Sequence, residues 1–411
     1  MTIEPAGPRR IVISGHAREL RLFLVAGEHS GDHLGARLME AINARQRARV
    51  RYLGVGGAEM AARGLASQFP LEEVAVMGPL AVLRRLPQIV RRVYQTVDAA
   101  VAAEPDAVVI IDAPEFTHPI ARRIRRRQPG IPIIDYVSPS VWAWRPGRAR
   151  RMRGYIDHVM ALLPFEPEAH ARLGGPPCTY VGHPLIERLD DIRTADGEGL
   201  AARLGLDRAK PVLVVLPGSR GSEVGRLIEP FGAAIAHLVE RGLTPEVIVP
   251  ALPHVRERIK AGVAGWPVRV HLVEGDADRH AAFRRARAAL AASGTVTLEL
   301  ALAGTPMVVG YKVDPLAAPL LRRLIRASTV VLPNLVLGEN VFREYLQEEC
   351  TGAALGAALA DLMSDGPLRA AQLVALREAP RRMVLAGRAP SEAAADVVLA
   401  QIDERRRPAT H

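Results

Sequence analysis

Short runs of apolar residues alternate along this chain with longer segments in which apolar positions recur every three to four residues. The short runs predict buried strands, and the longer segments predict amphipathic helices. We expect a first series of strands at residues 21–26, 50–55, 107–112, 131–136, 158–163 and 179–181. A second series lies at residues 212–216, 246–250, 268–272, 288–291 and 307–310. Such alternation is typical of parallel βαβ units with helices on both faces of a sheet.

The two series predict an α/β protein with two Rossmann-like domains that face a central cleft. Residues 185–207, between the series, are charged and poor in strand character, and they predict a linker. The expected parts are a weakly structured N-terminal extension (1–20), an N-terminal domain (21–187), a C-terminal domain (188–366) and a C-terminal helical segment (367–411). That last segment could pack back on the N-terminal domain, and residues 11–13 could add a short edge strand.

The composition is that of ordinary globular material, with 49% hydrophobic and 24% charged residues. Cys178 and Cys350 lie far apart and outside any Cys/His cluster, which argues against a disulfide framework or a zinc site and fits a reducing cytosol. The net charge of +10 comes almost entirely from arginines scattered over many predicted helices, so we expect no nucleic-acid partner. We also expect no signal peptide and no transmembrane helix, because glycine, proline and Glu299 interrupt the most apolar long window, 286–311.

Two candidate sites follow strands of the first series. Glu28, Ser30 and Asp32 lie in a Gly-rich turn, and their side chains suit sugar hydroxyls better than phosphate. A plain tight turn is the alternative for this segment. Asp112 ends a strand of four apolar residues, where a partly desolvated carboxylate could act as a general base on a hydroxyl. The alternative for Asp112 is a helix N-cap.

A Trp-rich loop, Tyr-Val-Ser-Pro-Ser-Val-Trp-Ala-Trp-Arg at residues 136–145, follows another strand of this series. Open α/β sheets bind ligands at the carboxyl ends of their strands, so the loop is a candidate for the cleft. A rigid structural loop packed on its tryptophans is the alternative. Its candidate cleft residues are Ser138, Trp142, Trp144 and Arg145. His183, in a Gly-His-Pro sequence, is expected to be structural or to orient a substrate.

The second series contains a candidate diphosphate loop, Pro-Gly-Ser-Arg-Gly at residues 217–221, which joins an apolar strand to a long helix. Accessible backbone amides at Gly218, Ser219 and Gly221, together with the forked donors of Arg220, match a diphosphate better than a surface turn would.

A second strand-to-helix turn lies at Ser293, Gly294 and Thr295, whose amides could also bind phosphate. Glu299 follows one helical turn later, where it could meet a ribose. A buried helix would explain the leucines and alanines of this segment, but it would not explain the glutamate.

Metal ligation has little support in the sequence. Asp276 and Asp278 have the Asp-x-Asp form used by some metal-dependent glycosyltransferases, but they precede an Arg-rich helix and are better explained as a cap. No Gly-x-Ser-x-Gly elbow occurs, so a Ser/His/Asp hydrolase has no anchor here.

Ten motifs in matching order carry a specific resemblance. They are Val-Ala-Gly-Glu-His-Ser-Gly-Asp (25–32), Ala-Val-Met-Gly (75–78), Ile-Asp-Ala-Pro (111–114), the Trp-rich loop (136–145), Leu-Pro-Phe-Glu (163–166), Gly-His-Pro (182–184), Leu-Pro-Gly-Ser-Arg-Gly (216–221), Ala-Ser-Gly-Thr (292–295), Pro-Met-Val-Val-Gly-Tyr (306–311) and Leu-Pro-Asn (332–334). With these motifs the chain resembles the lipid-A-disaccharide synthase family, whose members are inverting glycosyltransferases of the GT-B fold.

The resemblance implies that UDP-2,3-diacylglucosamine donates its sugar to the 6-hydroxyl of 2,3-diacylglucosamine 1-phosphate, with no cofactor and no metal. The products would be the β-1,6-linked disaccharide 1-phosphate and UDP. By the same resemblance Asp112 would be the general base and Arg220 would contact the donor diphosphate. The nucleotide and cleft residues it implies are Ser293, Gly294, Thr295, Glu299, Asn334 and Gln347, with Glu28 as a further candidate.

Two residues depart from the family's pattern. His29 occupies a variable small or polar position, and Arg343 stands where many members carry proline, which bears on the geometry around Gln347. The implied chemistry remains coherent, because an arginine and two helix N-termini can stabilise departing UDP without a metal.

Both implied substrates carry acyl chains, which requires an apolar surface in contact with a bilayer. Residues 74–94 predict an amphipathic basic helix that could lie on an anionic inner-membrane surface, and a core-packed helix with a solvated arginine face is the alternative. The candidate membrane and acyl residues are Met77, Leu80, Leu83, Arg84, Arg85 and Leu86. The implied location is the cytoplasm, at the inner face of the cytoplasmic membrane, and family members can form homodimers.

Two other functions fit part of the sequence. A UDP-sugar 2-epimerase-like GT-B enzyme would share the architecture and the nucleotide site, but it would not need an acyl-binding surface. A non-catalytic nucleotide-sugar or lipid-binding protein would keep the nucleotide site with an inert cleft, and Asp112 argues against it.

Overall fold

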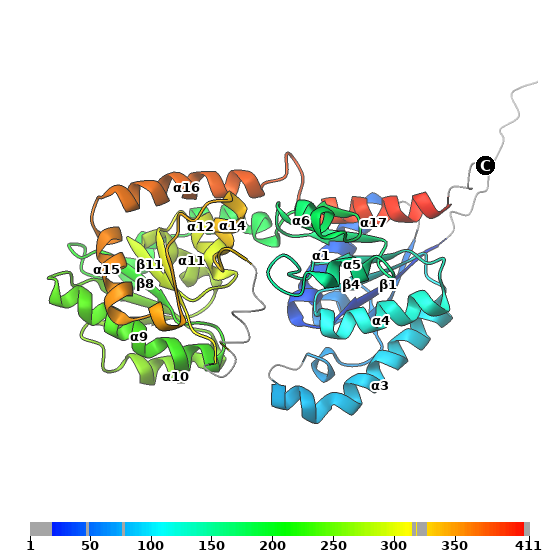
Figure 1. Cartoon of the computed structure of the whole chain (residues 1–411), viewed down its shortest axis with the longest axis horizontal. Coiled ribbons are helices and arrows are strands. Elements are labelled where there is room, and N and C mark those ends of the chain that lie inside the picture. Colours follow the sequence, from blue (N-terminus) through cyan, green and yellow to red (C-terminus); the bar gives the residue numbers. More distant parts are fainter. Residues whose placement is uncertain (1–18, 47–48, 76–78, 315–317, 319–326, 407–411) are drawn as a thin grey trace, which may run out of the picture. The chain divides into compact units, whose positions relative to one another are not determined.

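The computed structural model describes residues 19–46, 49–75, 79–314, 318 and 327–406 (Figure 1). Contacts divide the chain into two compact units, residues 1–136 with 395–411, and residues 137–394. Two parallel sheets form the framework, which confirms the predicted α/β class. The possible edge strand at 11–13 lies outside the described residues.

The first sheet has seven strands in the order β3-β2-β1-β4-β5-β6-β7. They are β1 (Leu20–Ala26), β2 (Val50–Val55), β3 (Ala66–Ser67), β4 (Ala107–Ile111), β5 (Ile133–Tyr136), β6 (His158–Ala161) and β7 (Cys178–Tyr180). All six predicted strands of the first series are present. The structure adds β3, whose two residues are too few to form a hydrophobic pattern.

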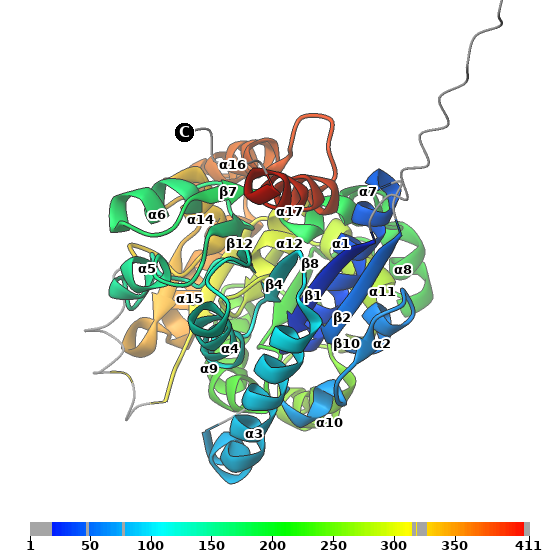
Figure 2. The ribbon, with the colours of Figure 1, turned by 90° about the vertical axis from the view of Figure 1, so that its right-hand side faces the viewer.

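The chain reverses its direction along this sheet, since β1 pairs with β2 on one side and with β4 on the other, as Figure 2 shows for β1 and β2. Right-handed crossovers then place the helices after β1 and β2 on one face and the long helices after β3 and β4 on the opposite face. The helices between these strands are α1 (His29–Arg45), α2 (Ala58–Ala61), η1 (Leu71–Glu73), α3 (Pro79–Ala103), α4 (Pro114–Arg127), α5 (Gly147–Met152) and α6 (Glu166–Leu173).

The second sheet has six strands in the order β10-β9-β8-β11-β12-β13. They are β8 (Val212–Leu216), β9 (Glu246–Pro250), β10 (Val270–Val273), β11 (Ala288–Ala291), β12 (Met307–Tyr311) and β13 (Glu344–Leu346). The five predicted strands are confirmed. Strand β13 was missed because its three residues are half-buried and include a glutamate, so they form no apolar run.

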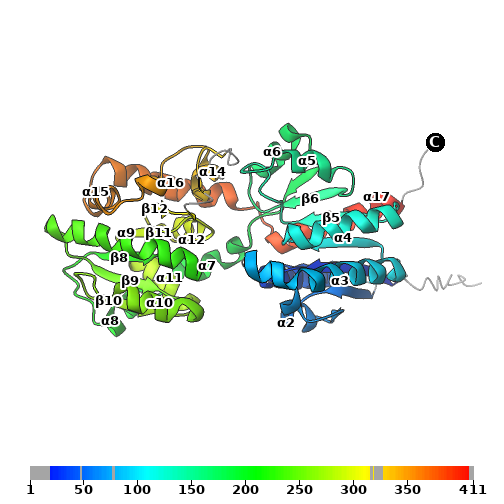
Figure 3. The same ribbon diagram turned by 60° about the horizontal axis from the view of Figure 1, so that its bottom comes forward.

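Two separate cores cover the faces of the second sheet. On β8, Val212, Val214 and Leu216 belong to one core, and Leu213 and Val215 belong to the other. The period of two explains why the strand reads as continuously apolar, because both of its faces are buried. One core is covered by α7 (Leu189–Thr194), α8 (Gly197–Leu204), α11 (Asp276–Arg285), α12 (Val296–Ala303), α14 (Leu332–Leu337) and α16 (Pro367–Met383). The other is covered by α9 (Gly221–Glu240), α10 (Pro253–Val263) and α15 (Gly352–Met363), with α9 and α15 side by side (Figure 3).

The interpretation of residues 185–207 as a linker is wrong. They form η2 (Pro184–Arg188), α7 and α8, and Ile192, Leu200 and Ala201 are buried in the core of the second sheet. The charged residues that suggested a linker lie mainly on the solvent side of these short helices. The few apolar residues that pack into the core are too widely spaced among them to form a clear hydrophobic pattern in the sequence.

The end of the chain returns to the first unit. Helix α17 (Pro390–Arg406) buries Val398 and Ile402 completely or nearly so. Asp396 pairs with Arg45 of α1 at 2.6 Å, and Arg406 pairs with Asp106 at 2.8 Å. Residues 395–406 therefore belong to the unit that contains β1.

Candidate active site

A cavity of about 610 Å³ opens in the second unit at the carboxyl ends of β8, β9, β10 and β11. Strands β8 and β11 flank the point where the sheet order reverses, which is where open α/β sheets bind ligands. Among the predicted residues, the cavity brings together Gly218, Ser219, Arg220, Ser293, Gly294, Thr295 and Glu299. Two loops that are more than 70 residues apart in sequence therefore form one wall. Gly221 begins α9 and does not line the cavity.

Glu223 organises the 217–221 loop, and the sequence interpretation missed it. Its Oε2 accepts hydrogen bonds from the amides of Ser219 (3.0 Å) and Arg220 (3.2 Å), and its Oε1 accepts one from the Arg220 guanidinium at 2.9 Å. The expectation that the Ser219 amide is free for a phosphate is therefore wrong. Gly218 has φ +115°, and a Cβ there would lie 2.5 Å from that of Glu223, so only glycine allows this closure. The Arg220 side chain itself remains 60% exposed.

The second loop presents Gly294 and Thr295 at the start of α12. The hydroxyl of Ser293 donates to the carbonyl of Val330 at 2.7 Å, which fixes this turn. One turn into the helix, Glu299 is 12% exposed, and its Oε2 lies 2.9 Å from Nη2 of Arg279. The cavity thus combines an exposed guanidinium, a helix start and a paired carboxylate, a set that suits a phosphorylated ribose.

Two predicted cleft residues have other positions. Asn334 is 1% exposed, its side chain bonds to the backbone of Phe342 through both its amide group and its carbonyl oxygen, and it also donates to Thr329. The prediction that it lines a cleft is wrong, because every one of these bonds holds the β13 loop in place. Gln347 lies outside the cavity wall and has a left-handed backbone with φ +53°.

Asp112, in the first unit, lies directly after β4 with φ +55°, and Ala113 follows with φ +45°. Consecutive non-glycine residues in the left-handed region are uncommon, and such strain gathers at functional sites. The Asp112 carboxylate accepts a hydrogen bond from the Ser30 hydroxyl at 2.9 Å and one from the Ala113 amide at 2.8 Å. Gly27 allows this approach, since a Cβ there would lie 2.5 Å from the Ala113 Cβ. The two predicted loops of this unit therefore meet.

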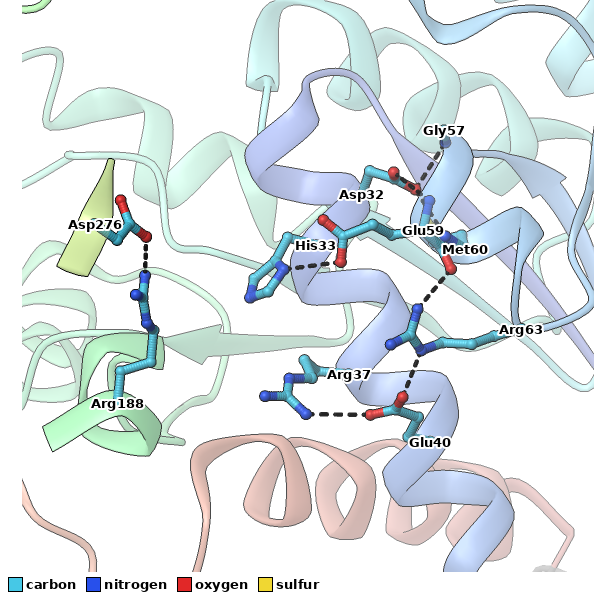
Figure 4. A network of polar contacts seen from close by, with 10 residues as sticks. All are labelled: Asp32, His33, Arg37, Glu40, Gly57, Glu59, Met60, Arg63, Arg188 and Asp276. Carbon is cyan, nitrogen blue, oxygen red and sulfur yellow. Dashed lines mark hydrogen bonds and ion pairs between the residues drawn. The ribbon is translucent and has the colours of Figure 1, made fainter. Parts of the chain in front are cut away.

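Asp32 has a structural position in the same unit (Figure 4). It is 4% exposed and accepts hydrogen bonds from the amides of Gly57, Glu59 and Met60, at 2.7 to 3.1 Å. These bonds anchor the short helix α2 on α1, and they occupy the oxygens that we had assigned to sugar hydroxyls. Glu28 is the N-cap residue of α1, with an extended backbone.

Buried polar groups hold the Trp-rich loop in place through hydrogen bonds. The Trp142 indole donates to Oε1 of Glu166 at 3.1 Å and packs edge-on against Phe165. Ser138 is buried and contacts Nε2 of His170 at 2.8 Å. Trp144 lies outside this cluster.

The other end of the loop contains Trp144 and Arg145, which lie outside this cluster. The Trp144 ring stacks with the Arg145 guanidinium at 4.3 Å, and Arg145 is exposed with φ +53°. The loop therefore combines a rigid, Trp-packed base, as in our alternative interpretation, with a tip that carries an exposed cation and a half-buried aromatic ring.

Two buried side chains, Glu166 and His183, have shifted pKa values. Burial raises the pKa of the Glu166 carboxyl from 4.5 to about 7, although hydrogen bonds from Leu163, Trp142 and Leu162 oppose the rise. Burial lowers the pKa of the His183 imidazole from 6.5 to about 4, against the attraction of Glu299. His183 accepts from the amide of Leu185 at 3.2 Å, so its neutral ring caps η2, which supports the structural alternative for this residue.

A family model described as lipid-A-disaccharide synthetase matches residues 22–388. The protein named lipid-A-disaccharide synthase in Bradyrhizobium diazoefficiens is 50% identical over 96% of this chain and 100% of its own length. That of Nitrobacter winogradskyi is 53% identical over 94% of this chain and 96% of its own. This chain belongs to the lipid-A-disaccharide synthase family. As a family member it is a glycosyltransferase of lipid A biosynthesis, which confirms the function predicted from the ten motifs.

Solved structures with low identity share the fold of this family member. The UDP-GlcNAc 2-epimerase of Neisseria meningitidis, bound to UDP-GlcNAc, superposes with a TM-score of 0.60 at 12% identity, over 94% of this chain and all of its own. MurG of Acinetobacter baumannii gives 0.56 at 16% identity, over 93% and 99%. The predicted GT-B fold is confirmed. Because the epimerase likeness concerns the fold alone, the 2-epimerase alternative gains no support from it.

The segment predicted to meet lipid, residues 74–94, includes the first part of α3. Met77 lies outside the described residues, and the side chains of Leu80 and Leu83 are not described. Arg84, Arg85 and Leu86 are exposed. Leu86, Val90 and Tyr94 are 46%, 44% and 51% exposed at intervals of four residues, so they form an apolar stripe on one side of the helix.

Other expectations concern metals and membranes. Asp276 and Asp278 both lie in the first turn of α11 and are paired with Arg188 and Arg203. The N-cap residue of α11 is Gly275, so the interpretation of these aspartates as cap residues is wrong. Over the described ranges, no group of three or more His, Cys, Asp or Glu side chains is arranged to hold a metal ion. In the same part of the chain, no helix combines the length and apolarity needed to cross a membrane.

Proposed function

We propose that this family member transfers 2,3-diacylglucosamine from UDP-2,3-diacylglucosamine to the 6-hydroxyl of 2,3-diacylglucosamine 1-phosphate, with inversion and without a metal. The observation that carries the proposal is the match to one family over residues 22–388, together with a cavity built at the switch point of the second sheet. The cavity residues support a UDP donor there. The exposed guanidinium of Arg220 and the start of α12 supply positive potential for the diphosphate as UDP departs.

Asp112 is our candidate for the general base. Inversion in one displacement requires a group that removes the proton of the attacking hydroxyl, and a carboxylate held at a strand end can do this. The hydrogen bond from Ser30 and the amide of Ala113 orient the carboxylate, and the strained backbone at Asp112 and Ala113 supports a functional reason for this conformation.

The measurement that tests the reaction is UDP release from UDP-2,3-diacylglucosamine, in EDTA, with and without the monosaccharide 1-phosphate acceptor. We expect acceptor-dependent release from the wild type and a loss of about 100- to 10,000-fold in Asp112→Asn. The control is Asp98→Asn, which removes an exposed carboxylate from α3. Full activity in Asp112→Asn would refute our choice of base, and loss of wild-type activity in EDTA would refute metal independence.

We further propose that the protein is cytoplasmic and docks on the inner face of the cytoplasmic membrane through α3. The exposed stripe of Leu86, Val90 and Tyr94 lies beside the exposed cations Arg84 and Arg91, a pattern suited to an anionic lipid surface.

Vesicle flotation with anionic and with zwitterionic phospholipid tests this docking. The double variant Arg84→Glu/Arg91→Glu should lose binding to anionic vesicles, while the matched control Arg208→Glu/Arg241→Glu, at exposed positions of the second unit, should keep it. Equal binding of both variants would refute a role for α3. Light scattering of the purified protein without vesicles tests the homodimer expected from the family.

A further inference from the structure

A row of alternating charges runs from η2 to the cavity wall of the second unit. Nη1 of Arg188 lies 2.7 Å from Oδ2 of Asp276, and Oδ1 of Asp276 lies 3.0 Å from Nη1 of Arg279. Nη2 of Arg279 then lies 2.9 Å from Oε2 of Glu299. The first of these pairs is drawn in Figure 4. Arg279 therefore holds two carboxylates at once, one with each terminal nitrogen.

Asp276, Arg279 and Glu299 all line the cavity, whereas Arg188 does not. The Arg279 side chain is 21% exposed and that of Glu299 is 12% exposed, so this pair is largely withdrawn from water. Burying a carboxylate is costly unless a counter-charge accompanies it, and Arg279 supplies that charge for Glu299. Nε2 of His280, 2% exposed, adds a weaker contact with the same oxygen at 3.5 Å.

The two oxygens of Glu299 are not equivalent. Oε2 is the atom that faces both Arg279 and His280, in ion-pair contacts that lack hydrogen-bond geometry. Among the residues that the structure describes, Oε1 makes no hydrogen bond and no ion pair. A carboxylate fixed through one oxygen keeps the lone pairs of the other for a ligand in the cavity.

We propose that Arg279 is a positioning residue of the donor site, which holds Oε2 of Glu299 so that Oε1 accepts a hydroxyl of the nucleotide ribose. This inference rests on the proposed function, because it takes a UDP-sugar as the ligand of the cavity. The planar fork of Arg279 suits the task, since its two terminal nitrogens form separate ion pairs with Asp276 and Glu299. A lysine would supply the charge without the second anchor.

Asp276 is the other anchor of that fork. Burial alone would raise the pKa of its carboxyl, but the hydrogen bond from Arg188 and the charges of Arg279 and Arg188 hold that pKa below its ordinary value. Asp276 therefore stays charged across the neutral range, and Arg188 fixes it from outside the cavity.

Calorimetric titration with UDP, 2′-deoxy-UDP and 3′-deoxy-UDP tests this proposal without requiring activity. We expect the wild type to bind UDP about 10- to 100-fold more tightly than at least one deoxy analogue, as for a hydrogen bond to a charged acceptor. Arg279→Gln should bind UDP about 10-fold more weakly and should bind all three nucleotides within about threefold, since Glu299 is no longer held. Arg279→Lys should fall between these results. The control Arg285→Gln changes an arginine on the same helix as Arg279, which pairs with Glu198 of α8, and it should match the wild type.

An Arg279→Gln protein that keeps the wild-type preference for UDP would overturn the proposal, as would a wild type that binds UDP without preferring it. A wild type that binds no UDP at all would instead refute the proposed function. If Arg279→Gln fails to fold, Asp276→Asn removes only the outer anchor and should reduce the same preference. Steady-state kinetics give a separate readout, because loss of a positioning residue for the donor should raise the donor KM and leave kcat nearly unchanged.

Discussion

Replacing Glu166 by glutamine should make the second unit more stable at high pH. The side chain is 4% exposed, and burial raises the pKa of its carboxyl to about 7 from 4.5. In the folded protein the carboxyl therefore holds its proton up to a higher pH than in the unfolded chain. The stability that Glu166 contributes is complete below pH 4.5 and is lost as the pH rises through 7. At about 1.4 kcal/mol per pH unit, this loss amounts to about 3 kcal/mol.

The titration of His183 offsets this pH dependence in the wild type. Burial lowers the pKa of His183 to about 4 from 6.5, so its contribution is complete above pH 6.5 and is lost as the pH falls through 4. The two slopes have opposite signs in nearly the same range. The wild-type curve should therefore be flatter than either contribution, and only the difference between variant and wild type isolates Glu166.

Urea unfolding followed by tryptophan fluorescence, from pH 4 to 8.5, gives that difference. All three tryptophans, Trp142, Trp144 and Trp266, lie in the second unit and report on its unfolding. Glu166→Gln resembles the protonated acid, so we expect it to match the wild type near pH 4.5 and to exceed it by about 3 kcal/mol at pH 8. The control Glu168→Gln changes an exposed residue of the same helix. Parallel curves for the wild type and Glu166→Gln would refute the raised pKa and the burial argument behind it.

Three further changes have expected outcomes. His183→Gln should remove the acid-side loss, so that the wild type loses about 3 kcal/mol relative to this variant between pH 6.5 and 4 in the same urea assay. Gly218→Ala should weaken UDP binding about 10-fold in calorimetry, because its Cβ would press on Glu223, while Gly242→Ala, with φ +79° and open space, serves as the control. Asn334→Ala should lower the unfolding free energy by about 3 kcal/mol, since it leaves the buried backbone groups of Phe342 without partners, and a loss below about 1 kcal/mol would contradict that role.

The strands were predictable because buried parallel strands are continuous apolar runs, and every predicted strand within the described residues is present. The cavity loops were predictable too, since glycine, serine and arginine directly after such runs indicate an anion site. The same kind of motif was misleading for Asn334, because an asparagine that binds a ligand and one that binds its own backbone look alike in sequence. Only burial and hydrogen bonds separate the two cases.

Sequence analysis missed Glu223 and Arg279, whose roles depend on the residues that they contact. Glu223 is important because a left-handed Gly218 folds the loop back onto it, although its place three residues after Arg220, at the start of a helix, is a capping signal that could have been read. Arg279 is one of many arginines, and nothing in its local sequence distinguishes it from Arg285 on the same helix. Its importance depends on Asp276 and on Glu299, which belongs to the next helix.

Helix α17 gives the chain a constraint on its order of folding. The unit that contains β1 is completed by residues 395–411, which are synthesised after all of residues 137–394. During synthesis, the surface that packs against Val398 and Ile402 stays uncovered until the whole second unit has been made. Arg45 and Asp106 lack their ion-pair partners for the same period. The first unit therefore cannot be completed until the chain has been made to its last helix, although most of its residues are synthesised first. A chain that ended at residue 394 would contain every residue of the cavity, but its first unit would lack Val398, Ile402 and the partners of Arg45 and Asp106.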